Sequence, residues 1–257
     1  MLKKIEYDCE IVKAVRKNEY VDFLLKNKEL CDKCYAGGFL HIDCSGDTYL
    51  RRPISIAEAE NGYVRIIFQI KGKGTALLAE KKEGDKINVL GPLGHGFDVK
   101  NYIGKKVVLV GGGLGSFPLI YLARIFKSNA SFILGFRNRE LVYPEKDFEK
   151  DCHTYIMTDD GSMGQRGFTT DKLRELIASQ HVDAVMTCGP EIMMKKIAEI
   201  CIENNIPCQV SLEERMGCGI GTCLCCVRDV NINGAKERLC VCKEGPVFDA
   251  VKVYKQI

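Results

Sequence analysis

The sequence predicts a multi-domain protein: an antiparallel β-barrel domain at residues 1–100, an α/β domain with a parallel sheet at 101–210, and a small C-terminal module at 211–257. In the first hundred residues, short β-like runs alternate with turns. From about residue 104, apolar strands alternate with amphipathic helices, and after residue 211 a cysteine-rich and glycine-rich loop replaces that rhythm. A chain of 257 residues exceeds one domain of roughly 100–150 residues, so two domains and a smaller module fit its length.

The composition is that of an ordinary globular protein, with 46% hydrophobic and 28% charged residues. The formal net charge is only +3 and no basic block occurs, so nucleic acid is not an expected partner. The longest apolar stretch, residues 107–126, contains four glycines and a proline, which favours a strand, a loop and a helix over a membrane span. Fourteen cysteines without a signal peptide predict a cytoplasmic protein whose clustered thiolates bind metal.

The elements of the barrel domain follow from short runs between turn residues. Residues 39–44, 62–70 and 85–94 predict strands, and a single helix is expected at 75–84, between two glycines. In the α/β domain the predicted strands are 105–110, 131–136, 183–189 and 208–213. The predicted helices are 116–127, 169–180 and 190–205. Apolar strands alternating with such helices predict a parallel sheet covered on both faces.

The cysteines of the C-terminal module have the spacing of a plant-type [2Fe–2S] site. Cys218, Cys223 and Cys226 stand in C-x4-C-x2-C order, and Cys242 follows as a distant fourth ligand. The glycines between them suit a tight loop whose amides approach sulfur. A structural zinc site of four cysteines is the alternative, although such sites usually have paired C-x2-4-C knuckles.

The remaining cysteines near this module and near the N-terminus carry a weaker signal. Cys225 and Cys240 are surplus under either assignment and are interpreted as bystander thiols. Cys31 and Cys34 form a lone C-x-x-C pair, for which a bystander role is favoured over metal binding.

Two segments of the barrel domain together indicate a flavin dinucleotide. "RRPIS" at 51–55 follows an apolar strand, so Arg52 can bind a pyrophosphate through both guanidinium nitrogens. "KGKGT" at 71–75 opens the predicted helix, where Gly74 and Thr75 offer a second anion site. The alternatives are a surface arginine and a simple N-cap.

Two loops of the α/β domain indicate a second nucleotide. Four glycines lie between a buried strand and a helix, and a second loop, "CGP", ends another strand just before a helix. Because the carboxyl ends of parallel strands share one sheet edge, the two loops together favour a nicotinamide dinucleotide. A purely structural glycine turn is the alternative. The predicted NAD-binding residues are Gly111, Gly112, Gly113, Gly115, Cys188, Gly189 and Pro190.

The ordered motifs RPIS, GKGT, GPLGHGF, GGGLGSFP, DDGSMGQRG, CGP and CGIGTCLCC…CKEGPVFD resemble the ferredoxin-reductase superfamily. Within it, the chain resembles the electron-transfer subunits of class 1B, NAD-dependent dihydroorotate dehydrogenases over nearly its whole length. The resemblance implies that Cys218, Cys223, Cys226 and Cys242 hold the cluster. It implies that FAD is lined by Arg52, Pro53, Ile54, Ser55, Ile67, Phe68, Gln69, Gly74 and Thr75.

The three cofactors form a chemical series. Nicotinamide moves two electrons as hydride, a [2Fe–2S] cluster moves one, and a flavin exchanges either, so FAD belongs between NAD and the cluster. No acid/base pair or nucleophile motif remains, so no catalytic residue is assigned, and the four histidines, including His95 on a loop, are interpreted as isolated. The resemblance implies NAD rather than NADP, so Arg137 and Arg139, which follow the second strand, are interpreted as surface residues.

The resemblance also implies a partner: an FMN-containing dihydroorotate dehydrogenase catalytic subunit, which passes electrons through this chain to NAD+ in pyrimidine biosynthesis. A lasting heterotetramer of two copies of each subunit is expected. The alternative is a subunit of an NAD(P)H:ferredoxin or sulfide-type oxidoreductase. A zinc-stabilised, nucleotide-binding regulator without enzymatic activity is a third possibility.

Overall fold

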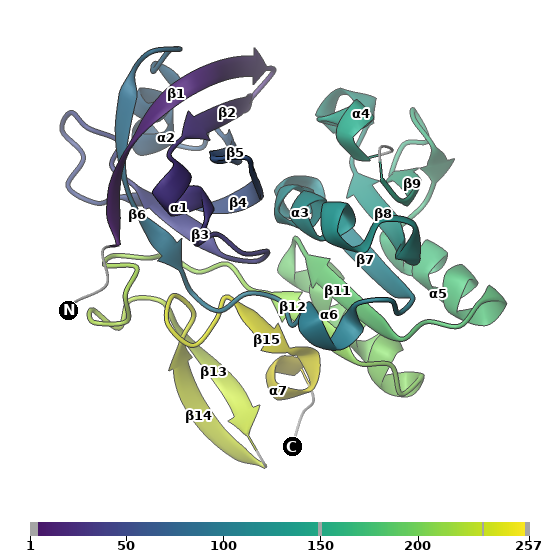
Figure 1. Ribbon diagram of the computed structural model, residues 1–257. Coiled ribbons are helices and arrows are strands. Elements are labelled where there is room, and N and C mark those ends of the chain that lie inside the picture. The colour runs from purple at the N-terminus through teal and green to yellow at the C-terminus, as the bar shows by residue number, and fades with distance from the viewer. Residues whose placement is uncertain (1–4, 149–150, 233, 255–257) are drawn as a thin grey trace. The chain divides into compact units, whose positions relative to one another are not determined.

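The computed structural model describes residues 5–148, 151–232 and 234–254, which fold into two compact units (Figure 1). The first unit consists of Met1–Gly96, Glu213–Val227 and Cys240–Pro246. The second consists of Phe97–Leu212, Arg228–Leu239 and Val247–Ile257. The cysteine-rich tail therefore contributes segments to both units, and the division into three domains at residues 100 and 210 stays a prediction.

The first unit contains a closed six-stranded antiparallel barrel with the strand order β1-β2-β5-β4-β3-β6. Its strands are β1 (Glu6–Lys17), β2 (Tyr20–Lys26), β3 (Phe39–Ile42), β4 (Arg52–Glu60), β5 (Tyr63–Gln69) and β6 (Lys86–Leu93). In β1, buried Tyr7, Cys9 and Ile11 alternate with exposed residues, which is the period of two expected when one strand face is buried. The predicted barrel is confirmed, and β1, β2 and β4 are additional to the predicted strands.

Two short helices accompany the barrel, α1 (Lys28–Cys31) and α2 (Lys73–Ala79). The prediction of one helix at 75–84 is wrong in its number and bounds. Asn27 starts α1, because its side chain accepts a hydrogen bond from the amide of Leu30 at 3.0 Å. The hydroxyl of Thr75 binds the main chain of Gly72, so α2 begins before residue 75.

The second unit contains a seven-stranded sheet with the order β10-β9-β8-β7-β11-β12-β15. Its strands are β7 (Val107–Gly112), β8 (Ala130–Phe136), β9 (His153–Thr158), β10 (Gln165–Arg166), β11 (Ala184–Cys188), β12 (Cys208–Ser211) and β15 (Val247–Asp249). All neighbours are parallel except β15, which is antiparallel to β12. The four predicted strands are confirmed, and β7 and β11 are buried along their whole length, as expected for central strands with helices on both faces.

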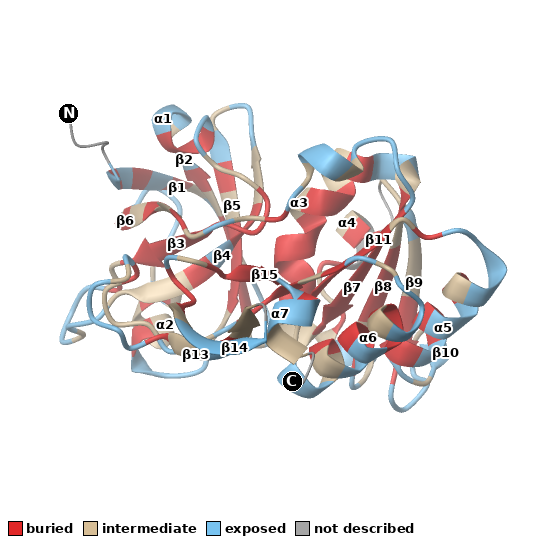
Figure 2. Ribbon diagram, turned by 90° about the horizontal axis from the view of Figure 1, so that it is seen from below, coloured by how far each residue is buried: buried red, intermediate tan, exposed pale blue. Residues whose placement is uncertain are grey.

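Helices cover both faces of this sheet. One face carries α3 (Phe117–Phe126) and α4 (Glu145–Phe148), and the other carries α5 (Thr169–Ser179), α6 (Glu191–Glu203) and α7 (Ala250–Tyr254) (Figure 1). Figure 2 shows the buried stripe of each long helix against buried strands. Short 3-10 turns are η1 (Lys100–Tyr102), η2 (Gly113–Ser116), η3 (Lys127–Asn129) and η4 (Arg139–Leu141). None of the helices in the described residues is long and apolar enough to cross a bilayer.

Part of the tail is regular, although the sequence predicted only a loop module there. β13 (Val227–Ile232) and β14 (Ala235–Cys240) form a two-stranded sheet. Asp229 on β13 forms ion pairs with Lys236 at 2.8 Å and Arg238 at 3.2 Å on β14. Along the chain, this hairpin lies between the third predicted cysteine ligand and the fourth.

Candidate redox site

The four predicted cluster ligands all lie in the first unit. Cys218, Cys223 and Cys226 belong to the cluster loop, which we define as residues 217–226, and Cys242 follows β14. Main-chain amides surround their sulfur atoms. The sulfur of Cys218 accepts hydrogen bonds from Ile220 at 3.5 Å, Thr222 at 3.3 Å and Cys223 at 3.4 Å, and that of Cys242 accepts one from Gly221 at 3.1 Å. Amide donors of this kind stabilise thiolates and tune iron–sulfur clusters.

The four cysteines form two pairs. The amides of Cys218 and Cys223 each donate to the other residue's sulfur, both at 3.4 Å. The amide of Cys242 donates to the sulfur of Cys226, also at 3.4 Å. Among the described residues, no three His, Cys, Asp or Glu side chains gather closely enough to hold one metal ion. Two pairs suit a cluster with two irons better than a single zinc ion, which needs four ligands at one point.

Cys218 and Cys242 differ in how readily they ionise. Burial acts to raise the pKa of Cys218, but the surrounding amides of Ile220, Cys223 and Thr222, with the Cys223 thiol, outweigh it and lower this pKa to about 6. Burial raises the pKa of Cys242, and the neighbouring Cys226 thiol raises it further. The loop therefore offers one ready thiolate, and a bound cation would have to displace the proton of Cys242.

The surplus cysteines lie in different surroundings. Cys225 is exposed, whereas Cys240 is buried beside the Cys226 thiol, and burial and that neighbour raise the pKa of Cys240. Burial, followed by the nearby Cys31 and Cys9, raises the pKa of Cys34 to about 12. A protonated, shielded thiol is a poor nucleophile, and the bystander role of Cys34 stays a prediction.

Two histidines of the barrel unit contact the segments that carry the predicted ligands. His95 Nδ1 lies 2.6 Å from the carbonyl oxygen of Lys243, next to Cys242. The ring of His41 lies against Gly219, next to Cys218: a Cβ on Gly219 would be 2.7 Å from His41 Nδ1. The sequence shows no motif around these two histidines, and neither contact was predicted from it. Sequence spacing carries no signal for either contact, because both join segments that are distant along the chain.

The predicted flavin residues lie on neighbouring barrel strands and on α2. Arg52, Pro53, Ile54 and Ser55 begin β4, and Ile67, Phe68 and Gln69 end its partner strand β5. The guanidinium of Arg52 lies directly against Gly74, where a Cβ would be 2.5 Å from Nε. The structure therefore brings together the two segments that the sequence indicated separately. A side chain at residue 74 would have to displace the guanidinium from this position.

The predicted NAD residues meet in the second unit, at the carboxyl ends of β7 and β11. Gly111 and Gly112 end β7, Gly113 and Gly115 belong to η2, Cys188 ends β11, and Gly189 and Pro190 lead into α6. A Cβ on Gly112 would be 2.8 Å from the Pro190 ring, and one on Gly189 would be 2.9 Å from the amide nitrogen of Gly112. The two loops are therefore in direct contact, as expected for ligand loops at one sheet edge.

Ser116 is a residue in this region that the sequence reasoning missed. It is completely buried, and its hydroxyl has no hydrogen-bond partner among the described residues. A Cβ on Gly111 would be 2.7 Å from this hydroxyl oxygen. Its place after the last glycine of the loop was visible in the sequence, but its burial was not.

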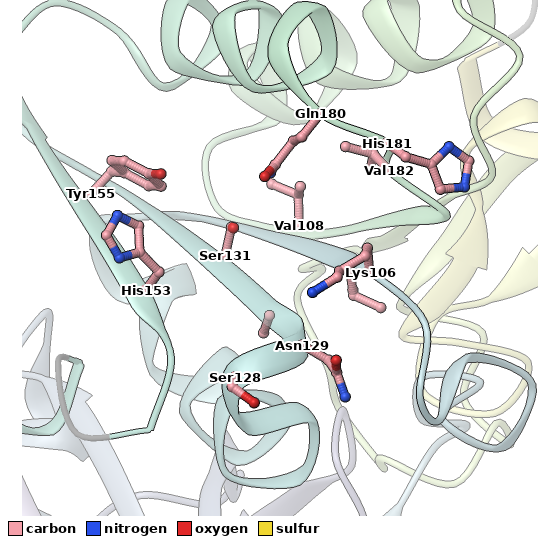
Figure 3. A pocket seen from close by; sticks show the side chains of 12 residues that line it. Lys106, Val108, Ser128, Asn129, Ser131, His153, Tyr155, Gln180, His181 and Val182 are labelled. Atoms are coloured by element: carbon pink, nitrogen blue, oxygen red, sulfur yellow. The ribbon is translucent and has the colours of Figure 1, made fainter.

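A cavity of about 190 Å³ opens at the other edge of the same sheet (Figure 3). Lys106, Asn129, His153, Tyr155 and His181 are among the residues that line it. It lies where strands β7, β8 and β9 begin, and none of the predicted site residues lines it. The predicted NAD residues lie instead at the opposite edge, where β7 and β11 end.

Comparison with known proteins shows the family. Residues 213–254 match the iron–sulfur cluster binding domain of dihydroorotate dehydrogenase B. A dihydroorotate dehydrogenase B (NAD+) electron transfer subunit from Caldanaerobacter subterraneus is 43% identical over 86% of this chain and 87% of its own. One from a Geobacillus species is 37% identical over 98% of this chain and 99% of its own. The chain belongs to the family of dihydroorotate dehydrogenase B electron transfer subunits.

Solved structures agree with this family assignment. An NADH-dependent reduced ferredoxin–NADP oxidoreductase aligns with a TM-score of 0.83 at 30% identity, over 96% of this chain and 90% of its own. A ferredoxin–NADP+ reductase from Neisseria gonorrhoeae, with bound FAD and NADP, has a TM-score of 0.65 at 16% identity over 78% of this chain and 92% of its own, which shows a shared fold alone. The predicted family and fold class are confirmed. The electron transfer subunits of the family are, by name, parts of a larger enzyme.

Proposed function

We propose that this chain carries electrons from an FMN-bearing dihydroorotate dehydrogenase catalytic subunit to NAD+, as a step of pyrimidine biosynthesis in the cytoplasm. The observation that carries the proposal is the arrangement of Cys218, Cys223, Cys226 and Cys242 in two amide-surrounded pairs, in the same compact unit as the Arg52–Gly74 contact. Bound FAD supplies an exchange of either one or two electrons, which links a one-electron cluster to a two-electron nicotinamide.

In the proposed flavin site, Arg52 holds the pyrophosphate. Its NH1 donates to the carbonyl oxygens of Leu50 at 2.5 Å and Arg51 at 3.3 Å, so the side chain is already oriented. Ser55 is exposed, whereas Ile54, Ile67 and Phe68 are buried in the barrel wall. We assign Ser55 and Gln69 to polar contacts with the flavin and the buried residues to the shape of its site.

In the proposed NAD site, the glycine loop after β7 lets the main chain approach the pyrophosphate, and the loop after β11 forms the other side. Arg137 and Arg139 follow β8 and are exposed. The amide of Arg139 donates to the hydroxyl of Ser162 at 2.8 Å. We propose that these arginines stay at the surface and that NAD is the nucleotide used.

The cluster loop also offers a surface for the catalytic subunit. Ile220 is 48% exposed and Leu224 is 65% exposed, and both lie among the predicted ligands. Leu224 has a φ of +53°, which is unfavourable for a residue with a branched side chain. We propose that the partner covers these side chains in a stable assembly of two copies of each subunit.

The test measures dihydroorotate-dependent NAD+ reduction with this chain alone, the catalytic subunit alone and the two mixed. Activity is expected only in the mixture, while this chain alone reduces artificial acceptors with NADH. Dihydroorotate oxidation by this chain alone, or no gain on mixing, would overturn the proposal.

A second candidate function is a subunit of an NAD(P)H:ferredoxin oxidoreductase, favoured by the 30% identical oxidoreductase structure with a TM-score of 0.83. The same assay separates the two, because that function predicts transfer to ferredoxin without a gain from the dihydroorotate-oxidising subunit.

A further inference from the structure

His41 is a buried polar residue whose ring nitrogens form no hydrogen bond of normal geometry with the residues that the structure describes. It lies on β3, its side chain is only 1% exposed, and neither ring nitrogen has a partner among the described residues. Buried polar groups are nearly always hydrogen-bonded, so an exception calls for an explanation such as an absent ligand or ion. A neutral imidazole carries one N–H donor, and in His41 that donor has no acceptor at normal hydrogen-bond geometry among the described residues.

The ring of His41 lies against the cluster loop. Gly219 has a φ of +72°, and a Cβ there would be 2.7 Å from Nδ1 and 3.1 Å from Cγ of His41. The main chain of Cys218 lies near the ring, and the two do not reach the geometry of a normal hydrogen bond. Glycine at 219 thus lets the loop pass close over the imidazole, next to the first predicted ligand.

The same histidine adjoins the predicted flavin segment. In the register of β3 and β4, His41 stands opposite Pro53, and the main chain of Arg51 lies near its ring. His41 is therefore next to both segments to which the proposed function assigns cofactors. All of these residues belong to the first unit.

We propose that His41 is a positioning residue for the cluster. When the cluster is bound, the ring N–H of His41 donates a hydrogen bond to a main-chain carbonyl oxygen of the Cys218–Gly219 segment. This inference rests on the proposed function, because it requires a cluster on the loop. The bond fixes the orientation of Cys218 and directs a positive dipole at the cluster. Such a dipole favours the reduced cluster, which carries one more negative charge.

The experiment uses the full chain purified without oxygen, in wild-type form and with His41→Leu, His41→Asn and His153→Leu. Leucine removes the donor and keeps an apolar side chain of moderate size, whereas asparagine keeps an N–H donor. His153 lies in the second unit and serves as the matched control. Iron and labile sulfide are measured first, and EPR-monitored redox titration then gives the reduction potential of the cluster.

His41→Leu is expected to keep its iron but to lower the equilibrium constant for cluster reduction about tenfold, which is a potential about 59 mV more negative. Asparagine should restore most of this loss, and His153→Leu should match the wild type. An unchanged potential in His41→Leu, or equal shifts with leucine and asparagine, would overturn the inference.

A measurement on the wild-type protein covers the case in which His41→Leu does not fold. With ¹⁵N only in histidine, pulsed EPR of the reduced cluster should show a weakly coupled nitrogen that His41→Asn removes. Absence of that signal from a wild-type protein that holds its cluster would refute the role of His41 alone. A wild-type chain without iron would refute the proposed function, and this inference with it.

Discussion

Two adjacent arginines at the start of β4 make the flavin assignment testable. Arg51 donates to the side-chain oxygen of Asn88 at 2.6 Å, to the Asn88 carbonyl at 3.2 Å and to Glu6 at 3.3 Å. It therefore ties β4 to β6 and β1. Arg52 donates to main-chain carbonyls beside it and lies against Gly74. Arg51 therefore links barrel strands, whereas Arg52 can bind a ligand.

Arg52→Ala should weaken FAD binding without unfolding the barrel. A hydrogen bond to a charged group contributes about 1.5–3 kcal/mol, so the dissociation constant for FAD should rise about tenfold to about 150-fold. Little core volume is lost, because Arg52 is only half-buried, and the free energy of unfolding of the apoprotein should change by less than about 0.5 kcal/mol. Fluorescence titration of the apoprotein with FAD and urea unfolding measure the two quantities.

Arg51→Ala is the matched control. Loss of its contacts should lower the free energy of unfolding by about 1–3 kcal/mol while the FAD dissociation constant stays within about threefold of wild type. Unchanged FAD affinity in Arg52→Ala, or an equal loss in the two variants, would refute the assignment of the pyrophosphate to Arg52.

Three further outcomes are expected. Cys223→Ser should lose iron and labile sulfide while Cys225→Ser keeps both, and equal loss by chemical analysis would contradict the ligand assignment. Gly115→Ala would place a methyl group against the main chain at Cys188 and Gly189, where β11 ends. NADH should therefore bind at least about tenfold more weakly, as measured by stopped-flow flavin reduction, while the iron content stays unchanged. A main-chain amide lowers the pKa of Asp183, so its ionised form stabilises the fold at neutral pH. Asp183→Asn should be less stable to urea than the wild type at neutral pH. This difference in stability should vanish as the pH falls through the lowered pKa of Asp183, and a difference that persisted at that pH would contradict a stabilising role of the ionised carboxylate.

Local patterns made part of the molecule predictable. The first three predicted ligands stand within nine residues, so their spacing alone indicated a loop around a cluster, and the positive φ of Gly219 and Gly221 agrees with that prediction. The contact between the two NAD loops followed from a general rule on parallel sheets. The pairing of the cysteines and their bonds to amides did not follow from spacing, because the fourth ligand comes from another segment.

Contacts between distant segments explain what was missed. β2 was not predicted. Asp22 interrupts its apolar run, yet Asp22 is buried through its bonds to Arg65 on β5, at 2.9 Å from Nε. The contact of His41 with Gly219, and that of Arg52 with Gly74, join residues that only the folded chain brings together. An ion pair between two strands, or a contact beside a proposed cofactor site, leaves no periodic pattern in the sequence.

The division of the tail between the two units has a consequence for how such a protein can evolve. The chain passes from one unit to the other after residues 96, 212, 227, 239 and 246. A gene fragment that ends at residue 212 would therefore lack two segments that belong to the barrel unit, including every predicted ligand of the cluster. A single recombination event cannot exchange either unit whole between relatives. The barrel, the sheet and the cysteine segments therefore cannot be exchanged as separate blocks by one crossover.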